Sequence, residues 1–194
     1  ANAVRIANKH NATIYHLSPS MMQILLLFAK KLKEPFPKFK RIICGTAKLD
    51  PELKLKFENA FQTVVTQQYG MTETLFISVN ARKQILCPES VGEPVSCEIR
   101  IFDESMNPAP QGSEGEIAVK SDSSFGEYFN QPDESRLSYC NGWFFTGDLG
   151  KMDSDGYLTV TGRKKELIKK GGVNISPHEI NAVLSGYDGV ADAA

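Results

Sequence analysis

Residues 41–67 read RIICGTAKLDPELKLKFENAFQTVVTQ and form a strand–helix–strand pattern. The runs 41–44 and 63–67 are short and rich in β-branched residues, which is typical of strands. Between them, Asp50 and Pro51 supply a helix N-cap and a first-turn proline. The apolar stripe expected on this helix consists of Leu53, Phe57 and Phe61. Two strands joined through a helix are expected to run parallel with a right-handed crossover.

The chain before residue 41 has the same order of elements. Thr13–His16 predicts a strand, and Ser18 with Pro19 predicts the start of a helix that runs through Ala29. We therefore expect an α/β fold with a parallel-stranded subdomain over residues 1–88. Ligands of such sheets collect beyond the carboxyl ends of the strands. The segments expected at that edge are 16–18, 45–47 and 69–73.

After residue 88 the pattern changes to short strands with alternating polarity. Residues 98–102 and 116–120 are two of them, and turns rich in Pro, Gly, Asn and Asp separate such runs. This predicts an antiparallel, β-barrel-like subdomain over residues 89–162. A hairpin and one helix follow in residues 163–194, which are too few to bury a core. We expect this last part to be a hinge and the beginning of a small α+β domain, truncated, with both chain ends cut inside a longer protein.

The composition excludes several classes of partner. The net charge is -1, so no global field attracts nucleic acid or an anionic membrane. The longest apolar run, residues 24–29, is far shorter than the ~20 residues of a membrane span. The four cysteines form neither a Cys-x-x-Cys pair nor a metal-ligand spacing with the three histidines. We expect reduced thiols and a cytoplasmic location.

The segment Tyr69-Gly70-Met71-Thr72-Glu73-Thr74 combines an aromatic face, a glycine, a hydroxyl and a carboxylate. A nucleotide site could use these for stacking on a base, close backbone contact, a bond to phosphate and Mg²⁺ ligation. The alternative is a polar loop in which Thr72 and Glu73 begin a helix.

Two further motifs lie downstream. Asp148, at the end of Phe145-Thr146-Gly147-Asp148, could accept hydrogen bonds from two vicinal ribose hydroxyls, and the alternative is an ordinary Gly-Asp turn. Residues 162–172 hold five cations, which could neutralise phosphates. The alternative for this run is a solvated hairpin face.

In this order, the Tyr-Gly-Met-Thr-Glu, Thr-Gly-Asp and Gly-Arg-x-x-x-x-Ile-Lys motifs, with the Ser-Pro-x-Glu-Ile end, resemble the adenylate-forming (AMP-binding) enzyme family. That family includes acyl-CoA synthetases, aryl-CoA ligases, firefly luciferases and peptide-synthetase adenylation domains. Supporting motifs are Gly45-Thr46-Ala47, Gly115-Glu116-Ile117 and Tyr128-Phe129-Asn130-Gln131-Pro132. The similarity covers nearly the whole chain, and it is the ordered set that makes it specific. Residues 1–88 would then be the C-terminal part of the family's large adenylation domain.

The resemblance implies a role for each matching residue. The nucleotide-binding residues would be Gly45, Thr46, Ala47, Tyr69, Gly70, Met71, Thr72, Asp148 and Arg163. The catalytic residues would be Thr72, Glu73, Lys165 and Lys169, with Glu73 as the Mg²⁺ ligand, Lys165 as the hinge residue and Lys169 at the site of thioester formation. Met71 and residues 75–77 would help line the acyl pocket.

The sequence also departs from the family pattern. Thr46 stands where the family often has glycine, and Gly171 stands where many members have a lysine. The family's Ser/Thr/Gly-rich phosphate loop would precede residue 1, and its catalytic lysine would follow Ala194. We therefore expect the chain alone to be inactive.

The resemblance implies an ATP-dependent, AMP-forming acyl-CoA ligase for the parent protein. The implied cofactors are ATP/AMP, Mg²⁺ and coenzyme A, and the implied partner is a carboxylic acid substrate. A homodimer is left open. Two alternatives are a non-catalytic adenylate-binding or interaction module, and an adenylating enzyme that uses a carrier-protein thiol or oxygen as acceptor.

Overall fold

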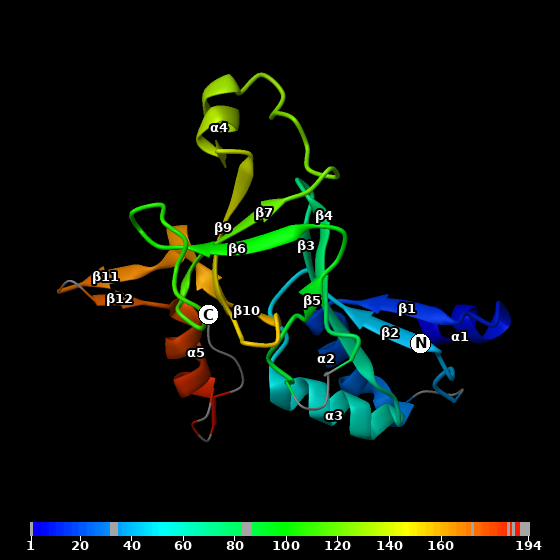
Figure 1. Ribbon diagram of the computed structural model, residues 1–194. Coiled ribbons are helices and arrows are strands. Elements are labelled where there is room, and N and C mark those ends of the chain that lie inside the picture. Colours follow the sequence, from blue (N-terminus) through cyan, green and yellow to red (C-terminus); the bar gives the residue numbers. More distant parts are fainter. Residues whose placement is uncertain are drawn as a thin grey trace. The chain divides into compact units, whose positions relative to one another are not determined.

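A computed structural model describes residues 2–31, 35–82, 87–171, 173–185, 187 and 189–190. The chain forms two compact units, Ala1–Val95 and Ser96–Ala194 (Figure 1). The division into three parts at residues 88 and 162 stays a prediction.

The first unit is built on one five-stranded sheet. Its strands, in spatial order, are β1 (Ile14–Leu17), β2 (Arg41–Cys44), β3 (Val65–Met71), β4 (Leu75–Val79) and β5 (Glu93–Pro94). The strands β1, β2 and β3 are parallel, whereas β4 and β5 are antiparallel to their neighbours. The predicted α/β fold with a parallel-stranded subdomain is confirmed.

The helices of this unit are α1 (Asn2–Lys9), α2 (Pro19–Phe28) and α3 (Pro51–Phe61), with a short 3-10 turn η1 (Ala29–Lys31) after α2. The predicted N-caps are present. The Ser18 hydroxyl accepts a hydrogen bond from the Met21 N–H at 3.2 Å, and the Asp50 carboxylate accepts one from the Leu53 N–H at 2.9 Å. The sequence pattern did not predict α1.

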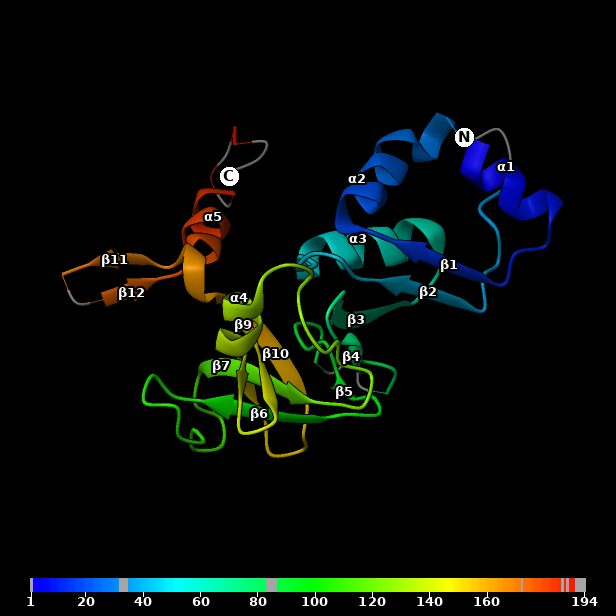
Figure 2. The same cartoon turned by 90° about the horizontal axis from the view of Figure 1, so that it is seen from above.

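The core of the first unit lies between these helices and the parallel strands. Figure 2 shows α2 and α3 on the same side of β1 and β2. The largest fully buried apolar side chains there are Leu17, Met22, Ile42, Phe57 and Val65. Leu53 and Phe61 pack against this cluster, so the predicted apolar stripe of α3 faces the sheet. This packing determines which side of the sheet remains for a site.

The second unit contains an antiparallel sheet in the order β10–β9–β7–β6. Its strands are β6 (Glu98–Phe102), β7 (Gly115–Lys120), β9 (Trp143–Met152) and β10 (Leu158–Arg163), and β8 (Tyr139–Cys140) pairs with β9. The helix α4 (Pro132–Leu137) lies between β7 and β8 in the chain. The consecutive residues Ile117, Ala118 and Val119 of β7 are all buried, so both faces of this strand are covered. The predicted antiparallel subdomain is confirmed.

A short 3-10 turn η2 (Lys164–Glu166) continues from β10 into the hairpin β11 (Ile168–Lys170) and β12 (Val173–Ile175), which the sequence predicted. The helix α5 (Pro177–Ser185) follows. Within the described parts of the chain, every helix is too short or too polar to cross a bilayer.

Candidate functional site

The carboxyl ends of β1 and β2 come together with the middle of β3 around Gly45. The Gly45 N–H donates to the Leu17 carbonyl at 3.3 Å, which ties the residue after β2 to the end of β1. A Cβ at Gly45 would lie 2.8 Å from Cγ of Gln68, so any side chain there would displace Gln68 where it crosses the end of β2. Beyond Gly45, the Gln68 amide nitrogen lies 3.1 Å from Nε2 of His16. Residues from three strands therefore share one small region.

The turn after Gly45 is strained at Thr46. This residue has a φ of +74°, in the left-handed region, although it carries a β-branched side chain. Such a conformation costs about 1–3 kcal/mol and tends to occur at functional sites. Thr46 and Ala47 are both exposed, so a ligand at this edge could reach them.

Tyr69 and Gly70 lie on β3, where the strand is interrupted by a β-bulge. Tyr69 pairs with Ser78, and the register shifts before Gly70 pairs with Phe76. A Cβ at Gly70 would lie 2.2 Å from the Leu75 carbonyl oxygen, so only glycine allows this close approach of the two strands.

Thr72, Glu73 and Thr74 form the turn between β3 and β4. The alternative in which Thr72 and Glu73 begin a helix is therefore wrong, because the chain turns back as a hairpin. Thr72 is exposed and Glu73 is half-buried. No role was predicted for Thr74, whose side chain is 1% exposed and whose hydroxyl has no hydrogen-bond partner among the described residues.

The segment expected to line an acyl pocket follows this turn. Leu75 and Phe76 are 60% and 59% exposed, whereas Ile77 is fully buried within its own unit. Only the first two side chains are therefore accessible to a ligand. The expectation for Ile77 is wrong, because its side chain is buried together with that of the next residue, Ser78, in the second half of β4.

In the second unit, Asp148 and Arg163 face each other on β9 and β10. The Arg163 Nε lies 3.1 Å from Oδ1 of Asp148, and Asp148 is only 5% exposed. The backbone beneath is held by Thr146, whose hydroxyl donates to the Ile117 carbonyl at 2.9 Å and accepts from the Asp148 N–H at 3.1 Å. Asp148 therefore lies in a fixed strand and is not a solvated turn residue. Thr146 belongs to the predicted motif, but no role was predicted for it.

The basic segment is only partly free in solvent. Lys164 Nζ lies 2.6 Å from Oε2 of Glu116, whose side chain is 11% exposed. Lys165 is exposed in η2, and Lys169 lies on β11 with a side chain outside the described residues. Gly171 has a φ of +60° in the hairpin turn, and Gly172 lies outside the described residues.

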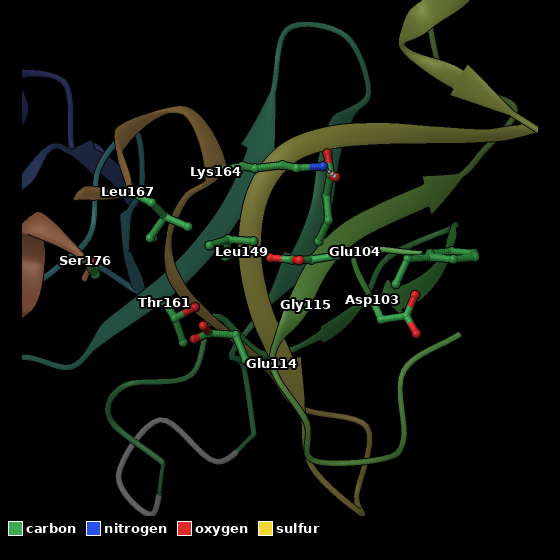
Figure 3. A pocket seen from close by; sticks show the side chains of 12 residues that line it. Asp103, Glu104, Glu114, Gly115, Leu149, Thr161, Lys164, Leu167 and Ser176 are labelled. Atoms are coloured by element: carbon green, nitrogen blue, oxygen red, sulfur yellow. Dashed lines mark hydrogen bonds and ion pairs between the residues drawn. The ribbon is translucent and has the colours of Figure 1, made fainter. Parts of the chain in front are cut away.

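A cavity of about 300 Å³ opens beside this ion pair (Figure 3). Its lining consists of Phe102, Asp103, Glu104, Glu114, Gly115, Glu116, Leu149, Thr161, Gly162, Lys164, Leu167 and Ser176. The hydroxyl oxygens of Thr161 and Ser176 are buried there, and within the described part of the chain neither has a hydrogen-bond partner. The sequence did not predict this cavity. In the part of the chain that the structure describes, no three His, Cys, Asp or Glu residues are grouped as a metal site.

Comparison with known proteins adds a family match. A family model described as "AMP-binding enzyme" matches residues 1–129. The oxalate–CoA ligase of Arabidopsis thaliana is 38% identical over 180 residues, which are 91% of this chain and 35% of that protein. The long-chain-fatty-acid–CoA ligase FadD13 of Mycobacterium tuberculosis is 35% identical over 163 residues, which are 81% of this chain and 32% of that protein.

The fold is also that of a solved enzyme. The o-succinylbenzoate CoA synthetase of Bacillus subtilis, in complex with its acyl-adenylate intermediate, superposes with a TM-score of 0.88 and 31% identity. The match covers 99% of this chain and 39% of that chain. This chain therefore spans about a third of the length of the relatives that it matches.

Proposed function

The chain belongs to the AMP-binding enzyme family, and from this membership we propose that the whole protein is an ATP-dependent, AMP-forming ligase that joins a carboxylic acid to coenzyme A. The two relatives described above are CoA ligases by name. Their names include a dicarboxylic acid and long-chain fatty acids, so relationship alone leaves the acid open.

The observation that carries the proposal is the carboxylate of Asp148, whose position is fixed by Thr146 and Arg163. Vicinal ribose hydroxyls are two donors, and a carboxylate fixed by its backbone can accept from both. Thr146 sets the backbone beneath Asp148, and Arg163 stays 3.1 Å from the carboxylate. This arrangement fits a ribose-binding carboxylate better than it fits an ordinary solvent-exposed Gly-Asp turn.

The family resemblance assigns the other nucleotide contacts to residues 45–47 and 69–72. Tyr69 would stack on adenine, with Gly45, Thr46, Ala47, Gly70 and Met71 as the surrounding rim. The exposed hydroxyl of Thr72 would donate to the α-phosphate. Glu73 would be the protein ligand of Mg²⁺, and one carboxylate is enough because this ion keeps several waters and takes phosphate oxygens. When bound, Mg²⁺ would neutralise charge on the phosphates.

Two steps would follow. A carboxylate oxygen of the acid attacks the α-phosphorus, the bond to pyrophosphate breaks, and an acyl-adenylate forms. The thiolate sulfur of coenzyme A then attacks the acyl carbon, and AMP leaves. Positioning and charge neutralisation would supply most of the rate. In the second step Lys165 would act as the hinge and Lys169 would face the thiol.

Acid-dependent exchange between ATP and pyrophosphate, measured on the whole protein, tests the first step. We expect Asp148→Asn to raise the KM for ATP about tenfold to a hundredfold, because it weakens charged hydrogen bonds. Asp122→Asn, at an exposed turn residue, is the matched control and should leave this KM unchanged. Formation of an acyl-CoA product tests the acceptor.

Exchange that fails with every acid offered would refute the proposal. The present chain alone should show no exchange, because it spans only about a third of a relative's length. The cytoplasmic location and the homodimer stay predictions.

A further inference from the structure

Two polar side chains at the edge of the parallel strands have no part in the contacts proposed so far. His16 is the third residue of β1, and Gln68 is the fourth residue of β3. They are 52 residues apart in the chain, yet the Gln68 amide nitrogen lies 3.1 Å from His16 Nε2. The bond passes over Gly45, which has no side chain to block it. His16 is exposed and Gln68 is half-buried, so a ligand can reach the pair.

We propose that Gln68 and His16 bind the far end of the acid substrate and select acids that carry a second oxyanion. This inference rests on the proposed function, because it needs the activated carboxylate to lie near Thr72. Gln68 precedes Tyr69 on β3, and neighbouring side chains of a strand point to opposite faces. A ligand bound by Gln68 would therefore not occupy the face of β3 on which adenine would stack against the Tyr69 ring.

The hydrogen-bonding capacity of the pair decides the chemistry of its ligand. In this contact the amide nitrogen of Gln68 donates and His16 Nε2 accepts, which leaves Nδ1 as the N–H group of the ring. The pair then has a second amide N–H and the Nδ1–H as further donors. A carboxylate or sulfonate, which only accepts, suits these donors. An acid with a hydrocarbon end would cover these donors and remove their hydrogen bonds to water without replacing them. A polar site discriminates strongly against such acids.

The Gln68–His16 pair also differs in position, and therefore in role, from the apolar side chains that are expected to line the acyl pocket. Leu75 and Phe76 are exposed apolar side chains on β4, which pairs with the part of β3 that follows Gln68. An acid that lies along them would meet apolar surface in its middle and polar groups only where it reaches Gln68 and His16. The pair therefore discriminates between acids by their terminal group.

The test uses the whole protein and acid-dependent pyrophosphate exchange with matched acids. Each pair differs by one terminal group: malonate with propionate, succinate with butyrate, and glutarate with valerate. We expect kcat/KM to favour the dicarboxylate at least about tenfold in one pair or more. Gln68→Leu and His16→Leu should each lower this ratio about tenfold or more, chiefly through the KM for the dicarboxylate.

Matched controls separate this role from a general loss of polarity. Gln23 on α2 and His10 after α1 are exposed residues away from the strand ends. Gln23→Leu and His10→Leu should keep the ratio, and His16→Gln should retain part of it because an amide also donates. A melting curve checks that each variant folds. If Gln68→Leu does not fold, His16→Leu, at an exposed position, carries the test.

Equal use of both acids in every pair, or an unchanged ratio in the folded Gln68→Leu and His16→Leu variants, would overturn the inference and leave the proposed function intact. Failure of exchange with every acid, long-chain acids included, would overturn the proposed function and this inference with it.

Discussion

Replacement of Thr46 by glycine should stabilise the protein. Thr46 has a φ of +74°, and a β-branched residue in this region stores about 1–3 kcal/mol of strain. Glycine removes the strain but loses more backbone entropy on folding, which costs roughly 0.5–1 kcal/mol. The expected net gain is about 0.5–2 kcal/mol. A domain of this size gains roughly 2–4 °C in Tm for each kcal/mol.

Scanning calorimetry of the whole protein measures this gain. Thr46→Ala should gain less than Thr46→Gly, because alanine keeps the Cβ that makes a positive φ unfavourable. Thr13 is the matched control, since it is exposed and does not have a positive φ. Thr13→Gly should lower the Tm. If Thr46→Gly lowers the Tm as much as Thr13→Gly does, the strain argument fails.

Burial raises the pKa of the Cys44 thiol to about 12, so native Cys44 should resist iodoacetamide at pH 8 while the three half-buried cysteines react. The pKa of the Cys44 thiol is higher in the folded protein than in an unfolded chain, where it is ~8.5. The contribution of this thiol to the free energy of unfolding is therefore fully present at neutral pH and is lost as the pH rises from about 9 towards 12. Urea unfolding of wild type and Cys44→Ala across that range measures it. A double-mutant cycle of Lys164→Met and Glu116→Gln should give a coupling of about 0.5–1 kcal/mol that falls in high salt; no coupling would show that the 2.6 Å pair does not stabilise the fold. Thr146→Val should lower the free energy of unfolding by about 1–3 kcal/mol and weaken AMP binding, because it removes the hydroxyl that accepts from the Asp148 N–H. Thr146→Ser keeps a hydroxyl and should retain both stability and AMP binding. Calorimetric titration with AMP measures the binding, and unchanged AMP affinity in Thr146→Val would contradict this prediction.

Much of the fold could be predicted because its signals are local. Ser18 and Asp50 begin helices through bonds to N–H groups three residues away, and proline follows each of them. The four-residue spacing of Leu53, Phe57 and Phe61 defines one face of α3 in any surroundings. Alternating polarity in residues 98–102 and 116–120 likewise predicted the strands β6 and β7, although both faces of β7 are covered in the structure.

The errors of prediction have physical causes too. Thr72 and Glu73 have polar side chains that suit either a helix start or a turn, and the pairing of β3 with β4 decides for the turn. The burial of Ile77 depends on which face of β4 meets the core. The first helix, α1, is short, and its one buried residue, Val4, contributes to a core made mostly by distant segments.

The candidate site was predictable in its residue types but not in its contacts. By itself, the sequence determined the order of strands and helices, the caps, and the motifs that carry the family relationship, because each depends on residues close together in the chain. Only the tertiary structure decided that Gln68 reaches His16 across Gly45, and that Arg163 lies opposite Asp148. These contacts depend on strand order and register, which arise when distant segments bury their apolar faces together.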